Sequence, residues 1–177
     1  QIEDPIAALR WLRQVSGKYG YDASRSAAMG GSSGGHVVAL WGTLPLPAED
    51  KVKAVVDLYG PTDLLTMPPN VLSEKRTRAD LAKANGALLL GGVVMDQPEK
   101  ARAVSALHQV SKDDASFLIM HGMDDPGVPV DQSERLHAAL KAAGAAGAAG
   151  ALEARVASIG KVVGEVIAAT EALRALL

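Results

Sequence analysis

Cysteine is absent from this 177-residue sequence, which excludes disulfides, a thiolate nucleophile and zinc sites built on cysteine. Aromatic residues make up only 3%, and no apolar run is long enough to cross a bilayer. Charge of neither sign dominates, since the formal net charge is −2, so the sequence favours neither nucleic acid nor a membrane as a partner. No signal peptide is recognisable.

Length and composition are typical of a globular protein with a sizeable core. The sequence has 48% hydrophobic residues and room for one domain, or for one domain with an appendage. The lack of cysteine suits a reducing compartment, so we expect a cytoplasmic rather than a secreted protein. Because the sequence begins with Gln1 and not with methionine, we expect it to be a piece of a longer chain.

A glycine- and serine-rich segment is the most informative stretch. Residues 30–34 (GGSSG) spell G-x-S-x-G between a predicted strand, 26–29, and a predicted helix, 36–44. This context indicates a nucleophile elbow, a sharp strand-to-helix turn that lifts a serine hydroxyl above a sheet. Ser32 is therefore the candidate nucleophile, and the backbone N–H of Ser33 is the candidate oxyanion donor. The alternative is a flexible Gly/Ser loop, because the pattern also arises by chance.

The rest of the first 144 residues alternates predicted helices and strands. Asp4 as N-cap and Pro5 after it predict a first helix that Gly17 and Gly20 end. An apolar strand is predicted at residues 52–59 and a second one at 116–121. Between them, residues 62–114 form an irregular segment of short helices that resembles a cap, and one more helix follows at 131–143. This order predicts an α/β domain around a mainly parallel sheet.

The end of the chain differs in composition. Three copies of Ala-Ala-Gly begin at residue 142, and apolar residues from 152 to 177 recur at alternating spacings of four and three. We therefore divide the chain into a core at 1–144, an Ala/Gly linker at 145–151 and a heptad-patterned helix at 152–177. Such a helix predicts a homo-oligomer formed through it.

Six segments, taken in order, resemble the α/β-hydrolase esterase/lipase family, especially its acetyl-xylan and feruloyl-esterase-like carboxylesterases. They are residues 3–12, 30–36 (GGSSGGH), 59–63 (YGPTD), 89–92 (LLGG), 110–114 (VSKDD) and 121–129 (HGMDDPGVP). The resemblance covers about residues 3–144. It implies a partial α/β-hydrolase core, without the strands that usually precede the elbow and without the family's histidine region.

The resemblance also implies roles for single residues. Ser32 matches the family's nucleophile, and Asp125 matches the triad acid, with the adjacent Asp124 as the alternative. The family's chemistry is acyl transfer, in which serine attacks an ester carbonyl, histidine moves the proton and aspartate orients the histidine. The implied substrate is a small-molecule ester with a short acyl group, and no metal or organic cofactor is needed.

The catalytic histidine of the family has no clear counterpart. Downstream of Asp125 lies only His137, which the helix pattern places on the surface. His121, at the end of the predicted acid strand, is the candidate substitute base, whereas His36 is predicted to be a packing residue and His108 precedes that strand. The His-Gly-Gly loop that usually gives the second oxyanion donor is absent as well.

Two hypotheses follow for the function. The first is a serine carboxylic-ester hydrolase that is inactive in this form unless a base is supplied. The second is a catalytically silent hydrolase fragment or fusion whose C-terminal helix mediates association. A peptidase of the same fold is disfavoured, since those relatives usually carry an aromatic residue where this chain has Ser33.

Overall fold

The computed structural model describes residues 1–145, which form one parallel sheet flanked by helices. Its strands are β1 (Ala27–Gly31), β2 (Ala54–Leu58) and β3 (Ser116–Met120), paired in the order β1-β2-β3. Its helices are α1 (Glu3–Tyr19), α2 (Ser33–Thr43), α3 (Arg78–Leu81), α4 (Asn85–Leu90), α5 (Pro98–Ala103) and α6 (Asp131–Ala143). The predicted α/β class with a parallel sheet is confirmed.

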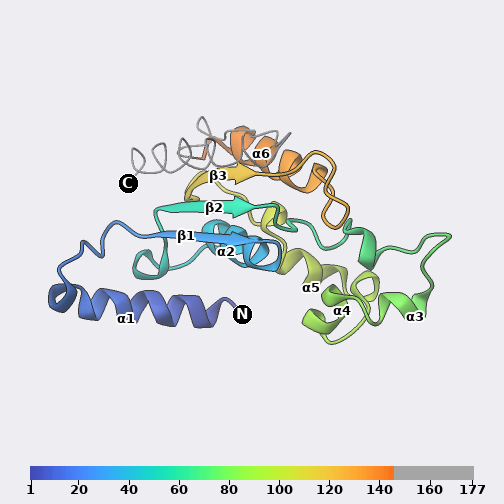
Figure 1. The fold of residues 1–177 in the computed structure, drawn as a ribbon, viewed down its shortest axis with the longest axis horizontal. Coiled ribbons are helices and arrows are strands. Elements are labelled where there is room, and N and C mark those ends of the chain that lie inside the picture. Colours follow the sequence, from blue (N-terminus) through green and yellow to red (C-terminus); the bar gives the residue numbers. More distant parts are fainter. Residues whose placement is uncertain (146–177) are drawn as a thin grey trace.

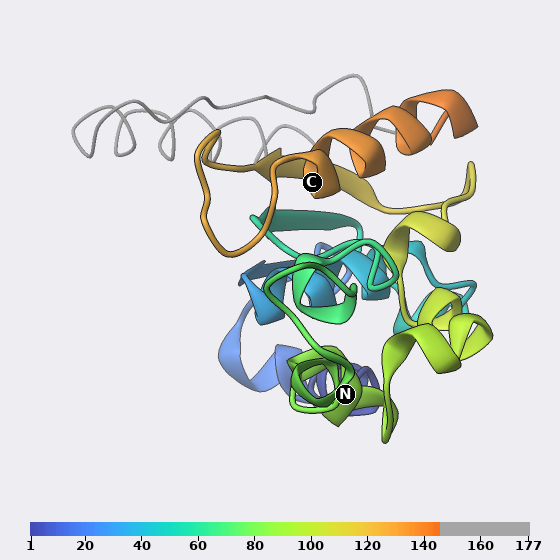
Figure 2. The same cartoon turned by 90° about the vertical axis from the view of Figure 1, so that its right-hand side faces the viewer.

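The strand directions decide where a ligand can meet the sheet. All three arrowheads point toward the side of the molecule that carries α3, α4 and α5 (Figure 1). Seen from that side, α1 lies beyond β1 and α6 lies beyond β3 (Figure 2). Ligands of parallel sheets bind at the carboxyl ends of the strands, so the short helices between β2 and β3 border the expected site.

The boundaries around the Gly/Ser segment differ from the prediction. β1 ends at Gly31, two residues later than expected, and α2 begins at Ser33, three residues earlier than expected. Ser32 alone separates the strand from the helix, so the hypothesis of a flexible Gly/Ser loop is wrong. Backbone pairing with β2 extends the strand through glycines that composition alone assigns to a loop.

The first helix begins two residues earlier than predicted, at Glu3 instead of Pro5. Ile2 occupies the N-cap position without a side-chain cap, and Asp4 lies in the first turn, so the prediction of Asp4 as N-cap is wrong. Pro5 is tolerated there because its missing N–H falls in the first turn, where helices lack partners for N–H groups. Gly20 ends the helix with a φ of 72°, as predicted, whereas Gly17 lies inside the helix and does not end it.

One hydrophobic core joins the sheet to the three longest helices. Side chains of α1, α2 and α6 pack against Val55 and Phe117, and they include Leu9, Val38, Trp41, Leu136 and Leu140. The burial of Leu136 and Leu140 on α6 confirms the inner side predicted for helix 131–143, whose bounds α6 matches. This core fixes β1 and α2, and with them the turn at Ser32.

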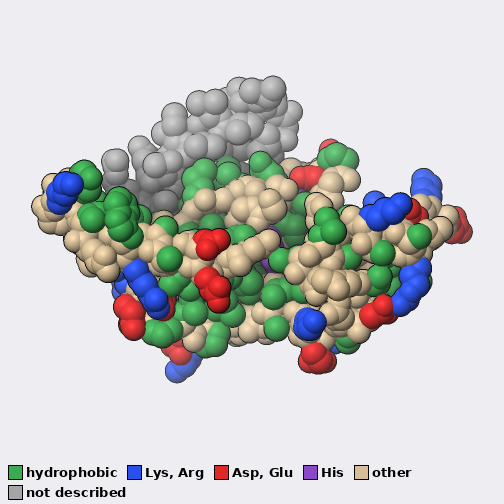
Figure 3. All heavy atoms as spheres, turned by 90° about the horizontal axis from the view of Figure 1, so that it is seen from below, with side chains coloured by type: hydrophobic (Ala, Val, Ile, Leu, Met, Phe, Trp, Pro, Cys, Tyr) green, Lys and Arg blue, Asp and Glu red, His purple; other side chains and the backbone are tan. Residues whose placement is uncertain are grey.

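The face of the molecule drawn in Figure 3, which is the underside of the view in Figure 1, carries charges of both signs. Acidic and basic side chains are interspersed there with hydrophobic ones, and neither sign forms an extended patch on that face (Figure 3). None of the helices within residues 1–145 is long and apolar enough to span a membrane. The predicted linker at 145–151, beyond its first residue, and the predicted helix at 152–177, with the oligomer expected from it, lie outside the described residues.

Candidate active site

Three residues form a row directly beyond the carboxyl ends of the strands. Each strand's last residue pairs with that of its neighbour, so Ser32, Tyr59 and His121 follow side by side. The N–H of Ser32 donates to the carbonyl of Leu58 at 2.9 Å, and the N–H of Tyr59 donates to that of Met120 at 2.8 Å. The sheet pairing therefore extends one residue further and fixes the backbone at both positions.

Ser32 is held in a strained backbone conformation. Its φ is 54° and its ψ is −118°, and Tyr59 has a φ of 47°; no other non-glycine residue in the described part of the chain has a positive φ. The carbonyl of Ser32 accepts the N–H of His36 at 3.0 Å, which ties it into the first turn of α2. Such strain costs about 1–3 kcal/mol and persists where the surroundings over-determine the conformation. This is the geometry expected of a nucleophile elbow.

The glycines around Ser32 have unequal roles. A Cβ on Gly30 would collide with the backbone of Gly34, and one on Gly35 would lie 2.5 Å from Asp57 Oδ1 and 2.8 Å from Gly60 Cα. A Cβ on Gly34 would meet nothing within 4 Å. The second close approach therefore belongs to Gly35, which stands one residue outside the G-x-S-x-G pattern.

The strain at Ser32 leads to a prediction about stability. Ser32→Gly is expected to give a chain that is about 1 kcal/mol more stable than Ser32→Ala, because glycine adopts a positive φ without a steric penalty. The serine side chain forms no capping hydrogen bond, so neither substitution removes one. Urea unfolding of the two variants measures the difference. An alanine variant as stable as the glycine variant would contradict a strained elbow.

The backbone N–H of Ser33 lies at the N-terminus of α2. Ser33 is the first residue of the helix, where N–H groups lack intrahelical acceptors and the helix dipole is positive. Both Ser32 and Ser33 are exposed. An N–H at this position is suited to stabilise the negative oxygen that forms when Ser32 attacks a carbonyl.

Ser32 and Ser33 open onto a cleft of about 350 Å³. Its other walls come from the segment after β2, from α4 and from the loop after β3, and they include Pro61, Leu64, Met67, Leu89, Gly127 and Val128. The loop that carries the predicted triad acid therefore borders the same cleft as the predicted nucleophile. Most of the lining is apolar, which suits an uncharged acyl group.

The carboxylate of Asp125 is fixed within that loop. Its Oδ1 accepts the N–H of Gly127 at 2.7 Å and that of Val128 at 2.9 Å. The hydrogen bond from Val128, assisted by that from Gly127 and by nearby His121, holds the pKa of Asp125 below its usual range, although burial opposes this. The group is therefore ionised at neutral pH. Asp124, the alternative acid, is exposed.

His121 is not placed to serve as the substitute base. Its Nδ1 lies 2.7 Å from the hydroxyl of Ser133, and its Nε2 lies 2.8 Å from the carbonyl of Val128. Because a carbonyl only accepts, Nε2 carries the proton and Nδ1 accepts from Ser133. Both ring nitrogens are thus engaged, and the ring braces the acid loop against α6 instead of reaching Ser32.

The other histidines are also occupied elsewhere. His36 is buried, with Nδ1 3.0 Å from the carbonyl of Pro61, and burial lowers its pKa, which fits the predicted packing role. His108 Nε2 lies 3.2 Å from Asp63 Oδ1, and His137 is half-buried on α6. Within residues 1–145, no three His, Asp or Glu side chains gather closely enough to hold a metal ion.

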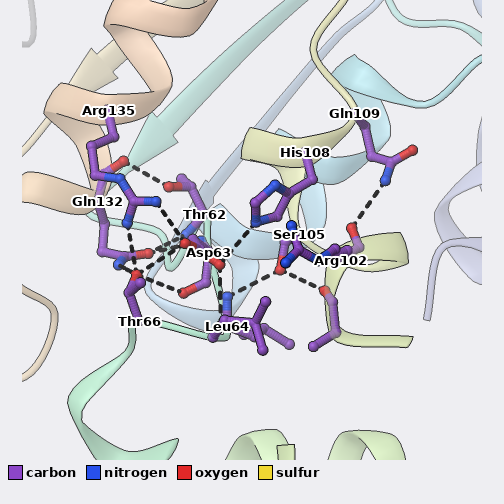
Figure 4. A network of polar contacts seen from close by, with 12 residues as sticks. Thr62, Asp63, Leu64, Thr66, Arg102, Ser105, His108, Gln109, Gln132 and Arg135 are labelled. Carbon is purple, nitrogen blue, oxygen red and sulfur yellow. Dashed lines mark hydrogen bonds and ion pairs between the residues drawn. The ribbon is translucent and has the colours of Figure 1, made fainter. Parts of the chain in front are cut away.

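Asp63 joins the segment after β2 to α6 (Figure 4). Arg135 Nη2 donates to its Oδ2 at 2.7 Å, and His108 lies at its Oδ1. Gln132 Oε1 accepts the N–H groups of Thr62, at 3.0 Å, and of Asp63, at 2.8 Å. This network fixes the cleft wall against the helix that follows the acid loop.

Sequence reasoning missed the side chains below and beside the elbow. Asp57 is fully buried on β2, and the ring of Tyr59 lies beside Gly31 and makes a T-shaped contact with the ring of His121. The signal for Asp57 is a single acid within the otherwise apolar residues 54–58, because aspartate is rarely fully buried unless it is paired.

Comparison with known proteins places this geometry in a family, since the BD-FAE family model matches residues 1–140. The chain belongs to the BD-FAE family. Esterase LipC of Mycobacterium tuberculosis is 29% identical to the BD-FAE chain over 154 residues, which are 80% of this chain and 36% of LipC. The expected α/β-hydrolase esterase resemblance is confirmed.

Solved structures agree with this assignment. A truncated carbohydrate esterase from gut microbiota matches with a TM-score of 0.71 and 32% identity, over 82% of this chain and 56% of that one. A bifunctional GH43-CE protein of Bacteroides eggerthii matches with a TM-score of 0.69 and 32% identity, over 81% of this chain and 20% of that one. The BD-FAE chain thus spans about a third of LipC and about half of the truncated esterase, so the partial α/β-hydrolase fold is confirmed.

Proposed function

We propose that this chain carries the nucleophile and acid of a serine carboxylic-ester hydrolase that acts on small-molecule esters with short acyl groups. Ser32 is the nucleophile, the N–H of Ser33 is an oxyanion donor, and Asp125 is the acid. The observation that carries the proposal is the strained Ser32 at the head of α2, opening onto a cleft that the acid loop also lines. The names of the relatives, an esterase and a carbohydrate esterase, support the same reaction class.

The proposed reaction begins when Ser32 Oγ attacks the carbonyl carbon of the ester. A C–O bond forms, and the carbonyl oxygen gains negative charge beside the N–H of Ser33. When the oxygen–carbon bond to the alcohol breaks, the alcohol leaves with a proton and Ser32 keeps the acyl group. Water then releases the carboxylic acid and regenerates the serine. Cofactors have no part in these steps.

The reaction needs a base, and in residues 1–145 no histidine ring is hydrogen-bonded to the hydroxyl of Ser32, although His36 lines the same cleft. Its four histidines are His36, His108, His121 and His137, and the first three have the partners described above. Loss of a triad member leaves a residual acceleration of about 10³–10⁴ over water in well-built hydrolases. We therefore expect slow hydrolysis by this chain alone and a faster rate once an imidazole is provided.

The substrate follows from the cleft. A volume of about 350 Å³ with walls from Leu64, Met67 and Leu89 accommodates a short apolar acyl group. Among residues 1–145, no Lys or Arg side chain lines the cleft, so an anionic substrate would find no Lys or Arg as an ion-pair partner there. An uncharged ester of a short carboxylic acid is therefore the favoured class.

Chemical rescue tests the proposal. Hydrolysis of p-nitrophenyl acetate by the full chain is expected to rise severalfold with added imidazole, beyond the reaction of imidazole alone, because free imidazole replaces the missing base. Ser32→Ala should show no increase over that background. Asp125→Asn, which keeps an acceptor for the amides of Gly127 and Val128, should reduce the rescued rate by about tenfold, since it removes the charge that orients the imidazole.

The same experiment addresses the alternative function. Equal rates for the wild type and Ser32→Ala at every imidazole concentration would contradict a working nucleophile. The chain would then be a catalytically silent scaffold, the second hypothesis drawn from the sequence. Trapping Ser32 with an alkyl fluorophosphonate and locating the adduct by mass spectrometry gives an independent readout, because trapping needs one attack and no turnover.

A further inference from the structure

Asp57 is a buried acid with no role in the proposed reaction. Its side chain is fully buried on β2, in register with Gly30 on β1, and its Oδ1 lies against Gly35 in the first turn of α2. Oδ1 accepts the N–H of Gly60 at 2.9 Å, whereas Oδ2 is buried without a hydrogen-bond partner. A carboxyl oxygen left unpaired in a protein interior is costly, so its position calls for an explanation.

The carboxyl group lies where the elbow meets the turn after β2. A Cβ on Gly35 and a Cβ on Gly60 would each lie 2.5 Å from Asp57 Oδ1. The one on Gly60 would also lie 2.5 Å from the carbonyl carbon of Gly35 and 2.7 Å from the amide nitrogen of His36. Asp57, the first turn of α2 and the turn after β2 thus form one close-packed junction, three residues from Ser32.

We propose that Asp57 is a positioning residue whose carboxyl group, while it is protonated, holds the first turn of α2 against the turn after β2, and so keeps Ser32 in its strained conformation. This inference rests on the proposed function of Ser32. The protonated group fills the junction without a buried charge. Once ionised, it places a negative charge at an oxygen that has no donor, and the junction is weakened.

Within residues 1–145, the groups around Asp57 offer no compensating charge. On α2 the titratable group beside this junction is His36, whose pKa is lowered by burial and whose Nδ1 lies 3.0 Å from the carbonyl of Pro61. The residues paired with Asp57 on the neighbouring strands are Gly30 on β1 and Ile119 on β3, and neither carries a charge. The turn after β2 contributes Tyr59, which is half-exposed. Burial accordingly raises the pKa of Asp57 to about 6, with the Gly60 N–H opposing it.

The sign of the pH dependence follows from this direction. The native state binds the Asp57 proton more tightly than an opened or unfolded state, where the pKa of aspartate is about 3.9. The stabilisation is therefore fully present below about pH 4 and is lost as pH rises through about 6. A difference of about two pKa units corresponds to a change of about 100-fold in the equilibrium that opens the junction.

Amide hydrogen exchange in the full chain tests the inference. Corrected for the intrinsic rates, protection of the amides of Gly35, His36 and Gly60 is expected to fall by about 100-fold between pH 4 and pH 7 in the wild type. In Asp57→Asn, which cannot ionise, protection of these amides should not change with pH. Asp114→Asn is the matched control, since burial also raises the pKa of Asp114. The Asp114 carboxylate accepts hydrogen bonds from the backbone N–H and the hydroxyl of Ser111 and none from the junction at Asp57. This control should keep the wild-type profile at the elbow.

Either of two results would overturn the inference. One is a wild-type protection that stays constant over this pH range, which needs no variant and so holds even if Asp57→Asn fails to fold. The other is an Asp57→Asn chain that keeps the wild-type profile. Exchange needs no turnover, so a chain that hydrolyses no ester can still show the effect, and an active chain can lack it. The failure of this inference is therefore distinguishable from the failure of the proposed function.

Discussion

Gly35→Ala is expected to destabilise the chain by about 3 kcal/mol, although it adds a single methyl group to a helix. The new Cβ would lie 2.5 Å from Asp57 Oδ1, 2.8 Å from Gly60 Cα and 2.9 Å from Gly60 N. Two of these atoms are backbone, so no side-chain rotation relieves the collision. Either α2 must move away from β2 or the turn after β2 must shift, and overpacking of this kind costs about 1–3 kcal/mol or more.

Gly34→Ala is the matched control, one residue earlier in the same helical turn. A Cβ there meets nothing within 4 Å, and alanine stabilises a helix by about 1 kcal/mol relative to glycine. We expect Gly34→Ala to be neutral or stabilising in chemical denaturation, in contrast to Gly35→Ala. Equal losses in the two variants would mean that the junction of α2 with β2 is looser than the structure shows.

This pair of glycines illustrates what the sequence can and cannot predict. The motif G-x-S-x-G includes Gly34 and omits Gly35, yet the close approach belongs to Gly35. Its neighbours, Asp57 and Gly60, are more than twenty residues away in the sequence. A pattern of consecutive residues locates the nucleophile because the turn is local. It does not locate the tight contact, because that depends on which strand lies under the helix.

The same distinction explains the other outcomes. The buried strands and α6 were predicted because continuous apolar runs and helical spacing are local signals. His121 was predicted as a substitute base from its place after a strand, but its partners, Ser133 and Val128, become visible only in three dimensions. The network around Asp63 was likewise missed, since Arg135 lies 72 residues from it.

Asp63→Ala is expected to cost about 3 kcal/mol of stability and to loosen the cleft. Its carboxylate, almost fully buried, binds Arg135 and accepts the N–H of Leu65 at 3.1 Å. Removing it leaves a half-buried guanidinium and a backbone donor without their acceptor. The next residue, Leu64, lines the cleft, so the proposed esterase rate should fall as well. Thermal unfolding and the imidazole-rescued rate measure the two effects.

Asp63→Asn separates the charge of this group from its shape. Burial raises the pKa of Asp63, but hydrogen bonds from Arg135, Leu65, His108 and Thr66 outweigh it and hold the pKa below its usual range. A lowered native pKa contributes stability that is present above about pH 4 and lost as pH falls through the native value. The stability difference between the wild type and Asp63→Asn should therefore be full at neutral pH and shrink in acid. A difference that stays constant down to pH 2 would show that the network acts through packing alone, and the ion pair with Arg135 would then have no part in holding the cleft wall to α6.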